Sequence, residues 1–206
     1  MLCRIDIDRF RFGVVFGALN RDEILAELKS EGSASGILVF PYGTLPAIDL
    51  KGEAGGVSGR FSGFAGLSDD IRSAVFCGVE TRMQGEKFLG AAIFYKGALA
   101  DIANRTQNVS GDAFRETGKI KIFSLKAGRI GLLIDTDCLL AENWAYLAPV
   151  CDLILCISRG NSEDFRGTVR EFSKVAGTKK LTRQEKSGLS IFPYLFVDEG
   201  GAEWAE

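Results

Sequence analysis

The segment Gly128-Arg-Ile-Gly-Leu-Leu-Ile-Asp-Thr-Asp137 is an apolar run that ends abruptly in two carboxylates. Residues 129–134 predict a buried strand, paired with a strand over residues 120–125 around the turn that precedes it. Asp135 therefore stands at the end of a buried strand. A carboxylate in that place must find a partner or become protonated.

Strands and helices alternate at both ends of the chain. Residues 12–16 and 36–40 predict buried strands, and between them Asn20 begins a helix with Glu23 placed as in a capping box. This order predicts a βαβ unit with parallel strands. The C-terminal part predicts helices at residues 142–147 and 162–175 and strands at 153–158 and 189–197.

The middle of the chain has a different pattern. Residues 43–66 are crowded with glycine and predict a long surface loop, after which Ser68 begins a short helix. Three strands follow at hairpin spacing, over residues 74–80, 88–95 and 98–102, and then a loop over 103–118. The whole pattern predicts a single domain over residues 1–206, of class α/β (α+β), with mixed sheets covered by outer helices.

Composition excludes several function classes. The 206 residues are 46% hydrophobic and carry 25 Lys plus Arg against 27 Asp plus Glu, a net charge of -2. This balance gives no broad electropositive face, so we expect no nucleic-acid partner. No apolar run approaches the roughly 20 residues that span a membrane, and the N-terminal residues lack the apolar core of a signal peptide. We therefore expect a cytoplasmic protein that binds no membrane.

The reactive side chains are limited. The chain has no histidine, which excludes Ser-His-Asp and Cys-His catalytic pairs and removes the commonest transition-metal ligand. Its five cysteines form no Cys-x-x-Cys pair, and the odd count argues against a disulfide framework. We expect no metal and no cofactor. Any catalysis must use carboxylates, Lys, Arg, Tyr, Ser or Cys.

Three segments, in order, resemble the nitrilase (carbon-nitrogen hydrolase) superfamily. The first is Ile37-Leu-Val-Phe-Pro41, similar to the family strand that ends in Phe-Pro-Glu. The second runs from Val75-Phe-Cys-Gly-Val-Glu80 through residues 88–94 to Lys96-Gly97. The third is 128–137 with Ala141-Glu142 and Cys151-Asp-Leu-Ile-Leu155, similar to the family's Gly-Arg-Ile-Gly-x-x-Ile-Cys-x-Asp, Pro-Glu and Ala-Asp-Leu-Ile-Leu.

The resemblance covers about residues 12–160 and implies an α-β-β-α sandwich that dimerises through its outer helices. Members of the family normally continue well past the length of this chain. In that family a Cys attacks the carbon, a Glu moves protons and a Lys stabilises the oxyanion. The matching positions here hold Asp135, Tyr42 and Arg105, so the resemblance implies that all three catalytic residues are replaced.

The replaced positions favour a noncatalytic, nitrilase-like protein whose remnant site binds a small anionic or polar ligand or a protein partner. The candidate binding residues are Tyr42, Arg105, Asp135, Asp137 and Cys138. We expect an Arg105–Asp135 ion pair, to which Tyr42 donates a further hydrogen bond. Cys138 has no base beside it and is disfavoured as a displaced nucleophile.

Two alternatives stay open. One is a hydrolase of carbon-nitrogen or ester bonds with rewired residues, in which Asp135 is nucleophile or base, Tyr42 the acid and Arg105 the oxyanion donor. The other is an accidental resemblance in an unrelated α/β domain. Asp112 could match a second family Glu that orients the Lys, but a solvated loop carboxylate is the favoured interpretation.

Overall fold

The computed structural model describes residues 1–17, 20–29, 36–50, 56–108, 111–117, 119–160, 162–180 and 191–205. Within these residues the first sheet follows the path β1–β2–β3–β5–β6–β7, with β4 beside β5 and β8 beside β6. Along this path β2, β3 and β5 are parallel, and the pairs β1–β2, β5–β6 and β6–β7 are antiparallel. The short strands β4 and β8 are parallel to β5 and β6. The strands are β1 (Leu2–Ile7), β2 (Phe10–Val15), β3 (Ile37–Phe40), β4 (Ile48–Asp49), β5 (Val75–Met83), β6 (Glu86–Tyr95), β7 (Ala98–Asn104) and β8 (Phe114–Arg115).

The second sheet, over the same described ranges, has the order β13–β12–β11–β10–β9. Its central strands β10, β11 and β12 are parallel, and an antiparallel strand closes each edge. The strands are β9 (Lys121–Leu125), β10 (Gly128–Ile134), β11 (Leu153–Ile157), β12 (Tyr194–Asp198) and β13 (Gly201–Ala205). The predicted hairpin around residues 126–128 is the β9–β10 connection.

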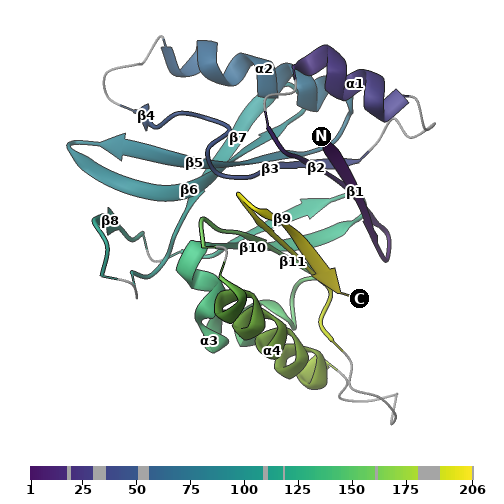
Figure 1. The fold of residues 1–206 in the computed structure, drawn as a ribbon, viewed down its shortest axis with the longest axis vertical. Coiled ribbons are helices and arrows are strands. Elements are labelled where there is room, and N and C mark those ends of the chain that lie inside the picture. The colour runs from purple at the N-terminus through teal and green to yellow at the C-terminus, as the bar shows by residue number, and fades with distance from the viewer. Residues whose placement is uncertain are drawn as a thin grey trace.

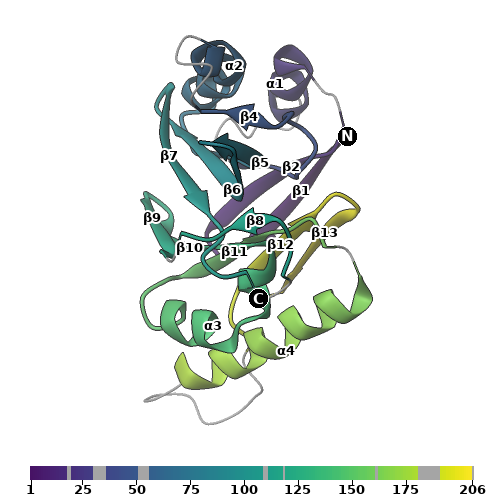
Figure 2. The same cartoon turned by 90° about the vertical axis from the view of Figure 1, so that its left-hand side faces the viewer.

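The two sheets face each other, with helices on both outer faces (Figures 1 and 2). Helices α1 (Arg21–Lys29) and α2 (Gly56–Asp70) cover the first sheet, and α3 (Ala141–Leu147) and α4 (Glu163–Lys180) cover the second. The space between the sheets is filled by buried apolar side chains from both, such as Phe76, Leu89, Ile134 and Leu155. Fully burying each such side chain stabilises the fold by roughly 1.5–3 kcal/mol. The predicted fold class, an α-β-β-α sandwich, is confirmed.

The predicted βαβ unit is present at the N-terminal end. Strands β2 and β3 pair in parallel, with Phe12 opposite Ile37. Between them the backbone N–H of Asn20 donates to Glu23 Oε2 at 2.8 Å, and the N–H of Glu23 donates to Asn20 Oδ1 at 3.0 Å. These reciprocal bonds form the capping box predicted for the start of α1.

The predicted loop over residues 43–66 is wrong at the short strand β4 and from Gly56 onward, and residues 51–55 lie outside the described residues. Helix α2 begins at Gly56 and continues to Asp70, so Ser68 lies in its last turn and does not begin a helix. The glycines weaken the helix intrinsically, by about 1 kcal/mol each relative to Ala. Burial of Phe61 and Leu67, which are 3% and 2% exposed, against the first sheet outweighs that cost. The helix therefore depends on tertiary packing.

No helix in the described part of the chain is both long enough and apolar enough to cross a membrane. All five cysteines are free thiols, and four of them are buried.

Candidate functional site at the ends of the parallel strands

Asp135 lies where a site is expected in an α/β protein, at the carboxyl end of a parallel strand. It directly follows β10, begins a short 3-10 helix, Asp135–Leu139, and has a φ of +51°. Few residues other than glycine adopt this left-handed conformation, and Asp tolerates it better than most. Such backbone strain persists only where the surrounding structure holds it in place.

Hydrogen bonds from two neighbouring strand ends hold the Asp135 carboxylate. Oδ2 lies 3.2 Å from Nη1 of Arg105, which directly follows β7. Oδ1 accepts from the Ser158 hydroxyl and from the Arg159 backbone N–H, both at 3.2 Å and both just after β11. The side chain of Asp135 is 10% exposed and that of Arg105 is not exposed. The expected Arg105–Asp135 ion pair is therefore present and joins the two sheets.

Arg105 has a second and closer carboxylate partner. Its Nη1 and Nη2 donate to the two carboxylate oxygens of Asp112 at 2.8 and 2.7 Å, and Nη2 also donates to the Phe114 carbonyl at 3.1 Å. The interpretation of Asp112 as a solvated loop carboxylate is wrong. A planar guanidinium binds a carboxylate best in this two-point geometry, so Asp112 is the stronger partner of Arg105. The hydrogen bonds of Asp112 raise the pKa of Arg105.

The Asp137 carboxylate connects the 3-10 helix to the segment after β7 by hydrogen bonds. It accepts from the Thr106 backbone N–H, from the Thr106 hydroxyl at 2.7 Å and from the Gln107 backbone N–H at 3.1 Å. Burial raises the pKa of Asp137, and these hydrogen bonds oppose that rise. Asp137 is 1% exposed, so its oxygens are occupied by the protein itself. The geometry assigns it a positioning role.

Tyr42 does not complete the pair in the way expected. Its side chain is 4% exposed, and its hydroxyl has no hydrogen-bond partner among the described residues. The prediction that Tyr42 donates to the Arg105–Asp135 pair is therefore wrong. Burial, and then the nearby negative charge of Asp135, raise the pKa of Tyr42 well above its usual value. The phenol is neutral at physiological pH and cannot act as a general base.

Cys138 faces the other side of the second sheet. It is completely buried in the apolar cluster beneath α3 and α4, close to Cys156 and Trp144. Burial raises the pKa of its thiol well above the usual value, so the thiolate that a nucleophile needs is not formed. The structure agrees with the sequence argument against a displaced cysteine nucleophile.

Two further residues, Arg159 and Glu80, lie at the rim of the cluster around Arg105 and Asp135, and neither was predicted from the sequence. The guanidinium of Arg159 lies 4.8 Å from the centre of the Phe114 ring and forms a 2.8 Å ion pair with Glu80. Its position directly after the strand predicted over residues 153–158, which pairs with β10, could have identified Arg159 as a site residue. Glu80 gave no comparable signal, because it lies within β5 and reaches Arg159 only across the two sheets.

The cluster has an excess of negative charge. Two cations, Arg105 and Arg159, face four carboxylates, those of Glu80, Asp112, Asp135 and Asp137. Within the described residues, the remaining donor of Arg105, Nε, is buried and has no partner. The arrangement therefore does not favour the anionic ligand that the sequence suggested. An anion would meet carboxylates before it met an unpaired cation.

A cleft of about 700 Å³ lies next to this cluster without including it. Its walls come from α1, α2 and the segments that follow β2 and β3, and Phe40, Tyr42, Phe64 and Glu199 are among its lining residues. Arg105 and Asp135 are not. Among the described residues, no group of three or more Cys, Asp or Glu side chains is placed to hold a metal ion.

Solved structures resemble this arrangement of layers, whereas no protein-family model and no curated protein matches the sequence. The chain matches Saccharomyces cerevisiae Nit3, a member of branch 10 of the nitrilase superfamily, with a TM-score of 0.64 at 13% identity, covering 86% of this chain and 67% of that one. An amidase from Nesterenkonia sp. gives a TM-score of 0.65 at 14% identity, covering 98% and 81%. A carbon-nitrogen hydrolase from Helicobacter pylori gives 0.61 at 13% identity, covering 91% and 72%.

The chain has the nitrilase fold. Identities of 13–14% establish the fold alone, and a shared fold does not establish a shared reaction. This fold is the α-β-β-α sandwich that the resemblance implied, rather than a different α/β architecture.

Proposed function

We propose that this protein is a noncatalytic member of the nitrilase fold, in which the Arg105–Asp135 pair replaces a reactive site by a structural one. The observation that carries the proposal is that the protein itself engages the Asp135 carboxylate and both terminal nitrogens of the Arg105 guanidinium. Asp135 accepts from Arg105, Ser158 and Arg159, and Arg105 donates to two carboxylates and a carbonyl. Groups held in this way stabilise the fold and offer little to a substrate.

The chemistry of the residues supports the same proposal. An ionised carboxylate is a far poorer nucleophile toward an amide or nitrile than a thiolate. The raised pKa of Tyr42 removes it as a base, and Arg105 cannot carry a proton. The remaining role is binding, of a polar ligand or of a protein partner.

Turnover assays test this proposal. Purified protein is incubated with panels of amides, nitriles and esters, and we expect product formation no faster than in buffer. The informative variant is Asp135→Ala. Its matched control is Asp101→Ala, which removes a carboxylate from the half-exposed Lys121–Asp101 pair outside the cluster. Turnover that is lost in Asp135→Ala and kept in Asp101→Ala would overturn the proposal.

A rewired hydrolase is the second candidate, and the strained backbone of Asp135 favours it. A φ of +51° at the end of a strand is a conformation that often accompanies function. In this reaction an Asp135 oxygen attacks the acyl carbon and the amine or alcohol leaves, which gives an acyl-aspartyl anhydride. Hydroxylamine then converts the aspartyl carbonyl to a hydroxamate. Absence of that adduct at Asp135 after incubation with all three substrate panels would exclude this reaction.

We also propose a cytoplasmic homodimer that associates through its outer helices. Tyr146 on α3 and Val175 on α4 are 60% and 51% exposed, and both lie on the helices that cover the second sheet, which suits a surface covered by a second copy. Free thiols suit a reducing compartment. Sedimentation as a monomer at micromolar concentration would contradict the dimer.

A further inference from the structure

A second cleft lies at the other end of the sandwich, where the parallel strands begin. It has a volume of about 560 Å³ and is lined by Arg9, Arg11, Gly36, Ile37, Arg72, Ser73, Tyr95, Leu125, Lys126 and Ala127. Four of these residues are cationic, and no carboxylate is among the described lining residues. For a chain with a net charge of -2, this is a local concentration of positive charge.

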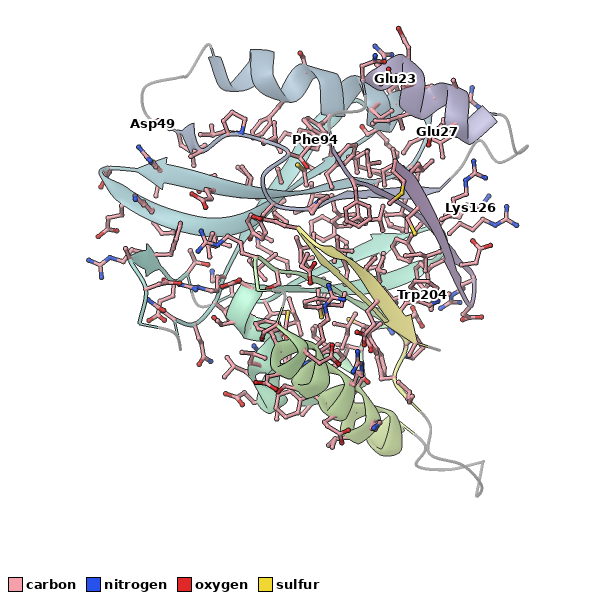
Figure 3. All side chains as sticks on the ribbon, viewed as in Figure 1. Glu23, Glu27, Asp49, Phe94, Lys126 and Trp204 are labelled. Atoms are coloured by element: carbon pink, nitrogen blue, oxygen red, sulfur yellow. The ribbon has the colours of Figure 1, made fainter. Side chains whose placement is uncertain are left out.

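The topology brings these cations together from separate parts of the sequence. Arg9 and Arg11 flank the start of β2, Arg72 lies between α2 and β5, and Lys126 lies in the turn between β9 and β10. All these positions are at the amino ends of β2, β5 and β10, away from Asp135. Figure 3 shows Lys126 at the periphery of the molecule, on the opposite side from Asp49.

Three of the four cations have no acidic partner among the residues that the structure describes. Arg9 pairs with Asp152 at 2.7 Å, but in the described part of the chain Arg11, Arg72 and Lys126 form no ion pair. Asp6 lies opposite Arg11 in the β1–β2 register without reaching ion-pair distance. Uncompensated like charges in one cleft repel one another and are stabilised when an anion binds between them.

The walls of the cleft suit a small molecule better than a long polymer. The half-buried ring of Tyr95 forms part of the lining, and the ammonium of Lys96 lies 5.2 Å from its centre. The half-buried Ser73 adds a hydroxyl group. A concave surface with several cations, a hydroxyl and one aromatic ring matches a compact ligand with more than one anionic group.

We propose that this cleft binds a small ligand that carries two or more phosphate groups. Arginine presents a planar fork that matches phosphate oxygens in two-point contacts, and Lys126 adds a mobile point charge. The site is independent of the function proposed for the Asp135 cluster, because the two share no residue.

Isothermal titration calorimetry with inorganic pyrophosphate tests the proposal on the full chain. We expect saturable binding that weakens as salt is raised and that exceeds the binding of sulfate at matched ionic strength. Each of Arg72→Gln and Lys126→Gln should weaken binding by about 5-fold, since charge-assisted hydrogen bonds are strong but these are partly solvated. Lys87→Gln, an exposed lysine on β6 outside the cleft, should leave the affinity unchanged.

Three results would overturn the inference. One is the absence of saturable pyrophosphate binding. Another is equal weakening by the Lys87→Gln control, which would mean general charge attraction. The third is binding of single-stranded RNA without pyrophosphate binding, which would make this face a nucleic-acid surface. Circular dichroism of each variant separates lost binding from lost folding, and Arg72→Gln and Lys126→Gln lie in different turns, so each checks the other.

Discussion

Removing Arg105 should destabilise the protein more than removing Asp135. Arg105 has no exposed side-chain surface and is shared by two carboxylates, so Arg105→Met leaves both Asp112 and Asp135 without their cation. Leaving a buried charge unpaired costs roughly 3–5 kcal/mol. Asp135→Asn is the suitable variant, because Asn also tolerates the left-handed backbone of residue 135. After this change Arg105 still binds Asp112, and the loss reduces to hydrogen bonds worth about 1–3 kcal/mol.

The double variant measures how much of this is due to the pair itself. In Arg105→Met with Asp135→Asn, the remaining carboxylate is Asp112, whose side chain is 28% exposed and can be hydrated. The free energy of unfolding should therefore fall by less than the sum of the single losses, with a coupling of about 1–3 kcal/mol. Urea unfolding of the four proteins gives this value directly.

The half-exposed Lys121–Asp101 pair is the matched control for this cycle. Its side chains are 37% and 36% exposed, so Lys121→Met and Asp101→Leu should couple by about 0.2–1 kcal/mol. Coupling between Arg105 and Asp135 below about 0.3 kcal/mol would refute the argument that this pair joins the sheets. A larger loss in Asp135→Asn than in Arg105→Met would refute the assignment of Asp112 as the second partner.

Three further perturbations follow from the packing. Tyr42→Phe removes a buried hydroxyl that has no described partner, so we expect the free energy of unfolding to stay the same or rise. If urea unfolding shows a free energy lower by more than about 1 kcal/mol, the hydroxyl forms a hydrogen bond that the structure does not show. Gly63→Ala should stabilise α2 by about 0.5–1 kcal/mol, because Ala favours a helix and its Cβ would meet nothing within 4 Å. Thermal unfolding measures this gain, and a loss of stability would contradict the assignment of residue 63 to a helix. Partial burial raises the pKa of Glu203, but hydrogen bonds from Arg170 and Tyr194 outweigh it and leave that pKa below its ordinary value. A depressed carboxyl pKa adds stability that is lost as the pH falls from about 5 through the folded-state pKa. In Glu203→Gln the free energy of unfolding should therefore fall less steeply with decreasing pH over this range. The same pH dependence in the variant and the unmodified protein would contradict this.

Local patterns predicted the elements whose signals lie within a few residues. The Asn20–Glu23 capping box and the parallel pairing of β2 with β3 required only neighbouring residues, and both are present. The ion pair of Arg105 with Asp135 was found through the order of motifs, since the two residues lie 30 positions apart. The order of the motifs assigned Arg105 and Asp135 to positions in a known fold, and that fold brings the two side chains within ion-pair distance.

The failures have a common physical cause, which is stabilisation from distant parts of the chain. The glycine-rich sequence of α2 has no strong helical pattern, and burial of Phe61 and Leu67 holds it in a helix. Strand β13 was missed because its burial is only partial and its pairing with β12 determines it. Asp112 was interpreted as solvated because Arg115 is closer to it in the sequence than Arg105, and only the fold makes Arg105 its partner.

Net charge concealed how the charges are distributed. A value of -2 predicted no electropositive face, yet the structure gathers four cations at the amino ends of the parallel strands and four carboxylates near the carboxyl ends. Residues 11, 72 and 126 form no run in the sequence, and only the strand order brings them to one cleft. In the nitrilase fold the loops at the two ends can change separately, because the shared core between the sheets holds each end in place. The binding site that we propose at the opposite end therefore does not depend on whether the Asp135 cluster carries out any chemistry.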